Sequence, residues 1–172
     1  MSNFKQFENN IREALNNVGG VTLRLPDQQS GFYGSANPCD FIHYNKPFFY
    51  EIECKVHEGN TLPFSCVTDT QWEKMLDASN VNGVLAGIFL WWTDKDETWW
   101  VPITVMKELK DRGFKSLNYS RMCDTALYLN IEGTKKRKYF DYDLTRFINM
   151  RYVINEISNN PKKYVDIYSE VL

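Results

Sequence analysis

Apolar residues at the start of the chain recur every three or four positions. Phe4, Phe7, Ile11 and Leu15 follow this spacing, which predicts an amphipathic helix that ends at the glycine pair after it. A short strand is expected next. The polar, glycine-rich stretch Gln28–Pro38 that follows the strand predicts a loop or a flexible lid.

Runs of apolar and aromatic residues in the middle of the chain alternate with polar turns, which is typical of buried strands. Between and after these runs, apolar residues recur at the three- to four-residue spacing of a helix. This order predicts an α/β fold with a central mixed β-sheet flanked by helices. The expected strands are Cys39–His43, Phe48–Val56, Gly83–Trp92 and Thr98–Ile103, and the expected helices are Thr68–Asn80, Val105–Arg112 and Leu144–Ile157.

Length and composition narrow the class of protein. The 172 residues suffice for one domain, and 43% hydrophobic residues are enough to build a core. The longest apolar stretch, around Val84–Trp92, is too short to cross a membrane, and Met1–Phe7 has no apolar segment that would direct secretion. We therefore expect a cytoplasmic protein. No C-x-x-C pair occurs, so reduced thiols rather than a zinc site are expected at Cys39, Cys54, Cys66 and Cys123.

The formal net charge is −2, which by itself argues against a protein that binds nucleic acid. The charge is uneven, however, because residues 1–100 have an excess of acids and residues 101–172 an excess of bases. The densest basic run is Lys135, Lys136, Arg137 and Lys138. Two interpretations stay open for it: a solvated turn between two strands, or an edge that contacts DNA phosphates.

The strand at Phe48–Val56 carries the candidate chemistry. Side chains alternate along a strand, so Glu51, Glu53 and Lys55 share one face although their apolar neighbours predict a buried strand. Burying these charges is costly unless they pair or bind a metal. Asp40 lies near the end of the adjacent strand, where its carboxylate can converge with that of Glu53. Two carboxylates and a backbone carbonyl suit Mg²⁺, and a lysine beside them can orient or deprotonate the attacking water.

Other candidate sites are weaker. His43 and His57 have no partner at metal-ligand spacing and are expected to be ordinary surface or turn residues. The pairs Trp91-Trp92 and Trp99-Trp100 favour packing in the core or a dimer interface over base stacking. No nucleotide-binding glycine motif follows a strand, so no nucleotide cofactor is expected.

Asp40 precedes Glu53-Cys54-Lys55 by thirteen residues, which resembles the D-(x)n-E-x-K pattern of the PD-(D/E)XK nuclease superfamily. Within it, the segment Asp40–Lys55 resembles the RecU-type Holliday-junction resolvases. The segment Phe7–Ile11 resembles the first helix of the archaeal resolvases, and this match falls on Glu8. Further segments that resemble the RecU type are Thr61–Ser65, Thr70–Trp72, Met75-Leu76 and Gly113–Leu117.

The resemblance implies a restriction-endonuclease-like fold, with residues 1–172 as one nuclease domain and a basic hairpin and helical tail in about 121–172. It implies that Asp40 and Glu53 bind the metal together with the Cys54 carbonyl, and that Glu8 completes the cluster through a water. Lys55 would orient or activate the attacking water. Gln71 would line the active centre, although an exposed helix glutamine is an equal alternative. The candidates for DNA contacts are Lys115, Lys135, Lys136, Arg137 and Lys138.

Glu51 has a secondary role in this scheme, because it lies about 6.6 Å along the strand from Glu53. The implied protein is a Mg²⁺-dependent endonuclease, with Mn²⁺ able to substitute, that cuts four-way DNA junctions as a homodimer. It would act in the cytoplasm, which is that of a bacterial host if the protein is encoded by a phage. Two alternatives remain: a nuclease for duplex or flapped DNA, and a catalytically silent module that binds DNA or protein. The chain departs from the RecU type in lacking the long stalk before the catalytic aspartate, for which only the loop Pro26–Pro38 is available.

Overall fold

The structure is a computed structural model of the chain, and it describes residues 3–25, 37–125 and 127–170. The strands are β1 (Val21–Arg24), β2 (Phe41–Asn45), β3 (Phe48–His57), β4 (Thr61–Pro63), β5 (Val84–Trp92), β6 (Glu97–Pro102), β7 (Ser116–Asn118), β8 (Leu129–Lys135) and β9 (Phe140–Asp143). The helices are α1 (Asn3–Asn17), α2 (Asp69–Ser79), α3 (Ile103–Asp111), α4 (Tyr119–Cys123), α5 (Thr145–Asn149), α6 (Arg151–Asn159) and α7 (Pro161–Glu170). The predicted loop or lid at Gln28–Pro38 lies outside the described residues except for its last two positions.

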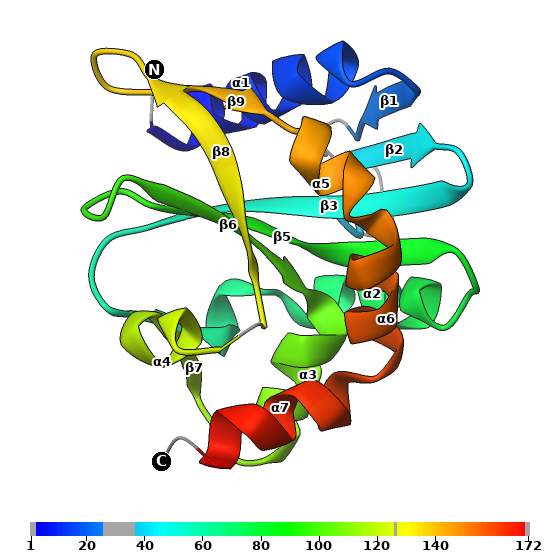
Figure 1. Cartoon of the computed structure of the whole chain (residues 1–172), viewed down its shortest axis with the longest axis vertical. Coiled ribbons are helices and arrows are strands. Elements are labelled where there is room, and N and C mark those ends of the chain that lie inside the picture. The colour runs from blue at the N-terminus through cyan, green and yellow to red at the C-terminus, as the bar shows by residue number, and fades with distance from the viewer. Residues whose placement is uncertain (1–2, 26–36, 126, 171–172) are drawn as a thin grey trace, which may run out of the picture.

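Seven strands form one sheet in the order β1-β2-β3-β5-β6-β8-β9. The pair β3 and β5 is parallel, and the other neighbours are antiparallel. Helix α2 makes the crossover between the two parallel strands, as a parallel connection requires. In Figure 1 the sheet runs across the middle, with α1 on one side and α2, α3 and α7 on the other. This architecture confirms the predicted mixed sheet flanked by helices.

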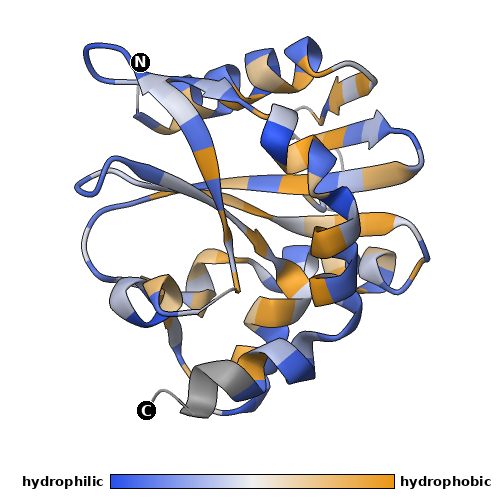
Figure 2. Cartoon of the chain, viewed as in Figure 1, coloured by the Kyte–Doolittle hydropathy of each residue, from blue (hydrophilic) through white to orange (hydrophobic). Residues whose placement is uncertain are grey.

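Each face of the sheet has its own hydrophobic core. On one face α1 packs Phe7, Ile11 and Leu15 against the inward side chains of β3, such as Tyr50 and Ile52. On the other face the core joins β5 and β6 to α2 and α3. Full burial of one such large apolar side chain contributes about 1.5–3 kcal/mol. Figure 2 shows hydrophilic segments of β3 inside this otherwise hydrophobic centre, and they belong to the candidate site described below.

Local signals explain where helix α1 ends and where helix α2 begins. Helix α1 stops at Gly19 and Gly20, which have φ values of 78° and 91° that favour glycine. Thr68 caps α2: its hydroxyl accepts a hydrogen bond from the N–H of Gln71, whose side chain accepts one from the N–H of Thr68. Both helices were predicted from the sequence, and their boundaries agree to within one or two residues.

The tryptophan pairs belong to the core. Trp91, Trp92, Trp99 and Trp100 are all buried, and the Trp99 ring stacks on Tyr128 with a centroid separation of 4.0 Å. The prediction of packing for these residues is therefore confirmed. Every helix among the described residues is too short or too polar to span a lipid bilayer. All four cysteines are free thiols.

Two expectations need correction, and one small sheet was not predicted. His43 is fully buried rather than a surface residue, because β2 lies between β1 and β3, and its Nδ1 is 3.0 Å from the Thr22 hydroxyl. The single helix expected at Leu144–Ile157 is divided at Met150 into α5 and α6. The small sheet formed by β4 and β7 was not predicted, since three-residue strands give too little alternation to recognise.

Gly20 and Gly19 form a matched pair for testing the turn after α1. A Cβ atom on Gly20 would lie 2.2 Å from the Tyr44 carbonyl oxygen, whereas one on Gly19 would meet nothing within 4 Å. Gly19→Ala should cost about 1–2 kcal/mol through its left-handed backbone alone. Gly20→Ala should cost a further 1–3 kcal/mol, roughly, because β2 must shift. Urea unfolding measures both, and equal losses would contradict this account of the turn.

Candidate active site

The structure brings together four predicted site residues from three elements. Glu53 and Lys55 lie in β3, Asp40 immediately precedes β2, and Glu8 lies in α1. The Lys55 Nζ donates a hydrogen bond of 2.7 Å to the Glu53 Oε1. The charges of Glu53, Glu8 and Lys55 all act on the Asp40 carboxyl, which places them within electrostatic range of it. We call these four residues the acidic centre.

The strand register explains which face the acidic centre occupies. Glu53 pairs with Ile88 and Lys55 with Leu90 across the parallel β3–β5 ladder, so their side chains project to the face covered by α2. Glu51 points to the same face, as predicted, and pairs with Ala86. The alternating residues of β3 point to the core under α1. Strand periodicity is therefore sufficient to separate the charged and apolar residues of β3.

Asp40 replaces a missing strand partner. The β2–β3 ladder ends at the pair of Phe41 with Ile52, so beyond that point no strand among the described residues pairs with this edge of β3. There the Cys54 N–H donates a 2.7 Å hydrogen bond to the Asp40 Oδ2. The Asp40 backbone is held on both sides, by its own N–H to the Ile52 carbonyl and by the Leu25 N–H to its carbonyl. The carboxylate is therefore fixed beside the strand that carries Glu53.

Burial and like charges shift the protonation of the acidic centre. Burial raises the pKa of the Asp40 carboxyl to about 7, and the negative charges of Glu53 and Glu8 add to the rise. The hydrogen bond from Cys54 and the charge of Lys55 oppose it. Burial also raises the pKa of Glu51. Additional positive charge, such as a bound cation, would therefore stabilise the acidic centre near neutral pH.

The Glu53 carboxylate is buried and only partly hydrogen-bonded. Glu53 is 3% exposed, and its Oε2 has no hydrogen-bond partner among the described residues. A buried carboxylate oxygen without a partner costs free energy that a bound cation would offset. The two carboxylates of Asp40 and Glu53 fit Mg²⁺, which binds to one or two carboxylates and keeps several waters. A larger cage is not seen: within the described ranges, no cluster of three His, Cys, Asp or Glu side chains is arranged to hold a metal.

The predicted carbonyl ligand has a suitable orientation. In a strand, the N–H and the carbonyl of one residue project to the same side. Because the Cys54 N–H points to Asp40, its carbonyl faces the same edge of β3. The Cys54 thiol itself is buried on the opposite face, where burial raises its pKa well above the usual value, so it is not a thiolate ligand.

Glu8 has a partner that the sequence analysis missed. The Arg24 guanidinium of β1 donates a 3.1 Å hydrogen bond to the Glu8 Oε2, and Glu8 is only 4% exposed. This ion pair ties α1 to the start of the sheet beside the acidic centre. The only signal in the sequence was that Arg24 is one of few bases in an acidic half of the chain.

Gln71 has a structural role in the helix. Its Oε1 accepts the Thr68 N–H at 3.1 Å in the cap of α2, so that oxygen is engaged. The start of α2 nevertheless lies near the acidic centre, since the charges of Lys55 and Glu53 reach the Cys66 thiol just before this helix. A role for Gln71 in lining the active centre stays a prediction.

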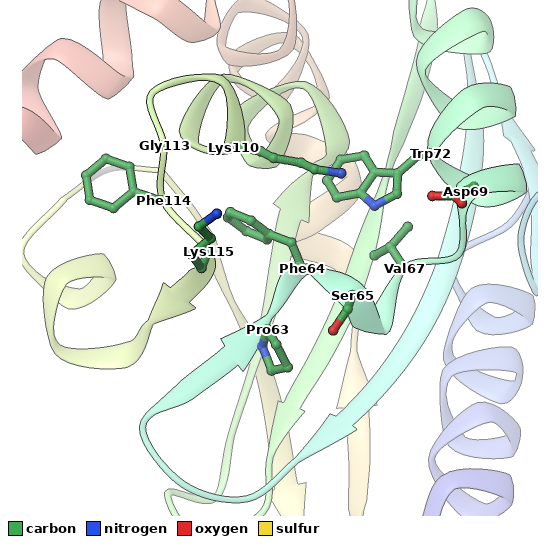
Figure 3. A pocket seen from close by; sticks show the side chains of 10 residues that line it. All are labelled: Pro63, Phe64, Ser65, Val67, Asp69, Trp72, Lys110, Gly113, Phe114 and Lys115. Carbon is green, nitrogen blue, oxygen red and sulfur yellow. The ribbon is translucent and has the colours of Figure 1, made fainter.

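The basic residues lie in two separate places. The run from Lys135 to Lys138 ends β8 and forms the turn to β9, which is exposed. The hairpin packs on α1, where the Asn10 amide donates to the Phe140 carbonyl at 2.9 Å, on the face opposite to the Glu53 side chain. Lys135 pairs with Asp96, and Lys136 with Asp141 at 3.0 Å. Lys115 lies instead at a cavity on the α2 face (Figure 3). Their contact with DNA stays a prediction.

A comparison with protein-family models identifies the relatives of this chain. The model of Recombination protein U, RecU, matches residues 21–143. The chain belongs to the RecU family. RecU-family proteins are Holliday-junction resolvases, which are endodeoxyribonucleases and depend on a divalent metal, so the resemblance stated above is confirmed. The matched segment contains Asp40, Glu53 and Lys55. Glu8 precedes it, so its assignment to the centre of this RecU-family chain rests on the geometry.

A solved structure is also similar to this RecU-family chain. It is Hjc of Archaeoglobus fulgidus, described as a Holliday junction resolvase from an archaeal hyperthermophile. The two are 19% identical in sequence, with a TM-score of 0.49, and the alignment covers 67% of this chain and 88% of Hjc. No curated protein matches this chain.

The raised pKa of Asp40 predicts a pH-dependent stability in metal-free protein. The carboxyl has a pKa of about 7 when folded against an ordinary 3.8. Its stabilising contribution is therefore present in full below pH 4 and is lost as the pH rises through 7. In EDTA at pH 8, Asp40→Asn should exceed the wild type in stability by about 2–4 kcal/mol. The difference should vanish towards pH 4, and urea unfolding at both pH values measures it.

Asp111→Asn is the control for this experiment, because Asp111 is an exposed residue of α3 outside the acidic centre. It should show no comparable pH-dependent gain. A constant difference between Asp40→Asn and the wild type from pH 4 to pH 8 would contradict the shifted pKa.

The ion pair of Glu8 and Arg24 predicts a coupling between α1 and β1. Arg24→Ala removes one partner of a largely buried carboxylate and should destabilise the chain by about 1–3 kcal/mol. Glu8→Gln in the same chain should recover part of that loss, because the buried charge is then gone. Thermal or urea unfolding of the single and double variants gives the coupling. Arg12→Ala, at an exposed position of α1, is the control, and purely additive losses would speak against the pair.

Proposed function

We propose that this RecU-family chain is a Mg²⁺-dependent endonuclease that cuts four-way DNA junctions as a homodimer. The observation that carries the proposal is the acidic centre: Asp40 is fixed beside Glu53 by the Cys54 N–H, and Lys55 lies 2.7 Å from Glu53. This is the arrangement that hydrolysis of a phosphodiester needs, with carboxylates for a cation and an ammonium group beside them. Membership of the RecU family supports the choice of substrate.

The residues of the acidic centre would have different roles in catalysis. Asp40 and Glu53 would hold the cation together with the Cys54 carbonyl, and Glu8 would contact it through a water. When bound, Mg²⁺ stabilises negative charge on the phosphate and lowers the pKa of a bound water, and Mn²⁺ is expected to do the same. Lys55 would orient or deprotonate the attacking water. The hydrogen bond from Lys55 to Glu53 keeps the ammonium group in one position. A group that is already oriented raises the rate, because less entropy is lost in reaching the transition state.

Symmetry supports the homodimer. A four-way junction has a two-fold axis and needs two cuts, which a pair of identical subunits around one axis can supply. Each subunit would bring one acidic centre and one exposed basic turn, from Lys135 to Lys138. Net charge is no obstacle, because part of the chain's acidity lies in the acidic centre, where a cation and Lys55 offset it.

Cleavage of three substrates tests the proposal. A four-way junction, a linear duplex and a flap are incubated with the protein in Mg²⁺ and in EDTA. The junction should be cut faster than the other two, and EDTA should abolish cutting. Asp40→Asn removes a metal ligand's charge while it can still accept the Cys54 N–H, so it should lose about 10³-fold or more in rate yet still bind junctions.

Asp111→Asn should cut at the wild-type rate. Normal cutting by Asp40→Asn would overturn the assignment of the acidic centre, and equal cutting of all three substrates would overturn selectivity for junctions. Analytical ultracentrifugation addresses the dimer: a strict monomer with and without junction DNA would contradict paired cleavage.

A further inference from the structure

A cavity of about 630 Å³ lies on the α2 face, between the start of α2 and the loop that joins α3 to β7. Its volume is in the range of about 300–1,000 Å³ that is typical of ligand sites. Figure 3 shows Lys110 and Lys115 reaching in from the α3–β7 side, with Phe64 and Trp72 opposite them and Ser65 at the edge. The acidic centre does not include any of these residues.

The two lysines bring positive charge to a cavity that is lined by aromatic side chains. The Lys110 Nζ lies 4.7 Å from the centroid of the Trp72 ring, and Lys115 lines the same cavity as Phe64 (Figure 3). Neither lysine takes part in an ion pair with a carboxylate in the described ranges of the chain. A lysine in the last turn of α3 is favoured by the helix dipole, but this does not explain why Lys110 lies over Trp72. Asp69 is the one acidic residue that lines the cavity.

The backbone around the cavity is held firmly. The Phe64 N–H donates a 3.0 Å hydrogen bond to the Lys115 carbonyl, and Pro63 pairs with Ser116 where β4 meets β7. Phe64 and Trp72 are buried and meet edge to face at 6.2 Å. Ring contact also restrains the Lys110 ammonium group. The cavity is therefore preorganised for an anion, which limits the entropy lost on binding.

The cavity and the acidic centre open on the same face of the sheet. Glu53 and Lys55 project to the face whose core includes Phe64 and Trp72. Ser65 is followed by Cys66, and the charges of Lys55 and Glu53 reach the Cys66 thiol. A DNA strand with its scissile phosphate at the acidic centre would therefore carry its neighbouring phosphates towards the two lysines.

We propose that this cavity binds a backbone phosphate of the cleaved DNA strand, adjacent to the phosphate that is cut. Lys110 and Lys115 supply ammonium groups, which bind phosphate as point charges, and Ser65 supplies a hydroxyl donor. The volume leaves room for the attached sugar. The assignment rests on the proposed nuclease function, because it takes the acidic centre as the place where the strand is cut.

Binding of a four-way junction in EDTA tests the proposal without requiring cleavage. The double variant Lys110→Ala/Lys115→Ala should lose roughly tenfold in affinity, and the slope of log K against log salt should fall by about 1 for each bound subunit, since one phosphate contact contributes about 0.9. The matched control is Lys107→Ala/Lys162→Ala, which removes the same charge from a partly exposed lysine of α3 and an exposed lysine of α7, both outside the cavity. The control should retain the wild-type slope, and equal slopes for both variants would overturn the proposal.

Neutral methylphosphonate linkages locate the contact on the strand. Each linkage replaces one phosphate near the cut. The linkage at the position adjacent to the cut should weaken binding of the DNA to the wild type. The same linkage should not weaken binding to Lys110→Ala/Lys115→Ala. The same interference pattern in both proteins would overturn the assignment. Titration with inorganic phosphate and with dAMP tests whether the cavity binds a free phosphate compound instead of DNA. Saturable binding of either compound, together with an unchanged salt slope for junction binding by Lys110→Ala/Lys115→Ala, would overturn the DNA assignment.

The outcomes separate this proposal from the proposed function. A protein that binds the junction with the expected slopes but does not cut it supports the cavity and contradicts the nuclease. A protein that cuts junctions, with a slope unaffected by the loss of Lys110 and Lys115, supports the nuclease and contradicts the cavity.

Discussion

The free energy needed to keep the Glu53 carboxylate buried is the constraint on which the rest of the site depends. Glu53 lies in the middle of β3, near the centre of the sheet. Its Oε1 accepts a hydrogen bond from Lys55, and its Oε2 has no partner among the described residues. Water cannot solvate that charge, so neighbouring groups respond to it. Lys55 approaches to 2.7 Å, and the Glu53 charge adds to the rise that burial causes in the pKa of Asp40, which reaches about 7. A divalent cation would reverse the second effect, which is why burial and metal chemistry occur together here.

The topology of the sheet makes this arrangement possible. Because β2 begins only at Phe41, opposite Ile52, while β3 continues to His57, no strand in the described part of the chain pairs with this edge of β3 beside its charged residues. Asp40 covers that edge with a side chain instead of a strand, and so a carboxylate faces the backbone of Cys54. Glu8 joins from α1 and is held by Arg24. An acidic site is thus assembled where a regular ladder is interrupted, while the two cores on either side of the sheet keep the interruption rigid.

The near-neutral net charge conceals a spatial separation of charge. Buried carboxylates lie at the acidic centre, whereas exposed lysines lie outside it, in the turn from Lys135 to Lys138 on the α1 face and at the cavity of Lys110 and Lys115 on the α2 face. A polyanion experiences these local fields rather than the sum, because screening confines each field to about 10 Å at ordinary salt. Composition therefore says little about whether this RecU-family chain binds DNA.

The sequence by itself determined the features that depend on neighbours in the chain: the spacing that forms α1, the extent of α2, the shared face of Glu51, Glu53 and Lys55, and the motif with Asp40. Each follows from a period of two or 3.6 residues or from a local hydrogen bond. Only the tertiary structure decided which distant groups meet. Arg24 pairs with Glu8, His43 is enclosed between strands, and Lys110 lies over Trp72. These contacts depend on how the helices pack and where β2 ends, and no local pattern encodes that, since the paired residues are far apart in the chain.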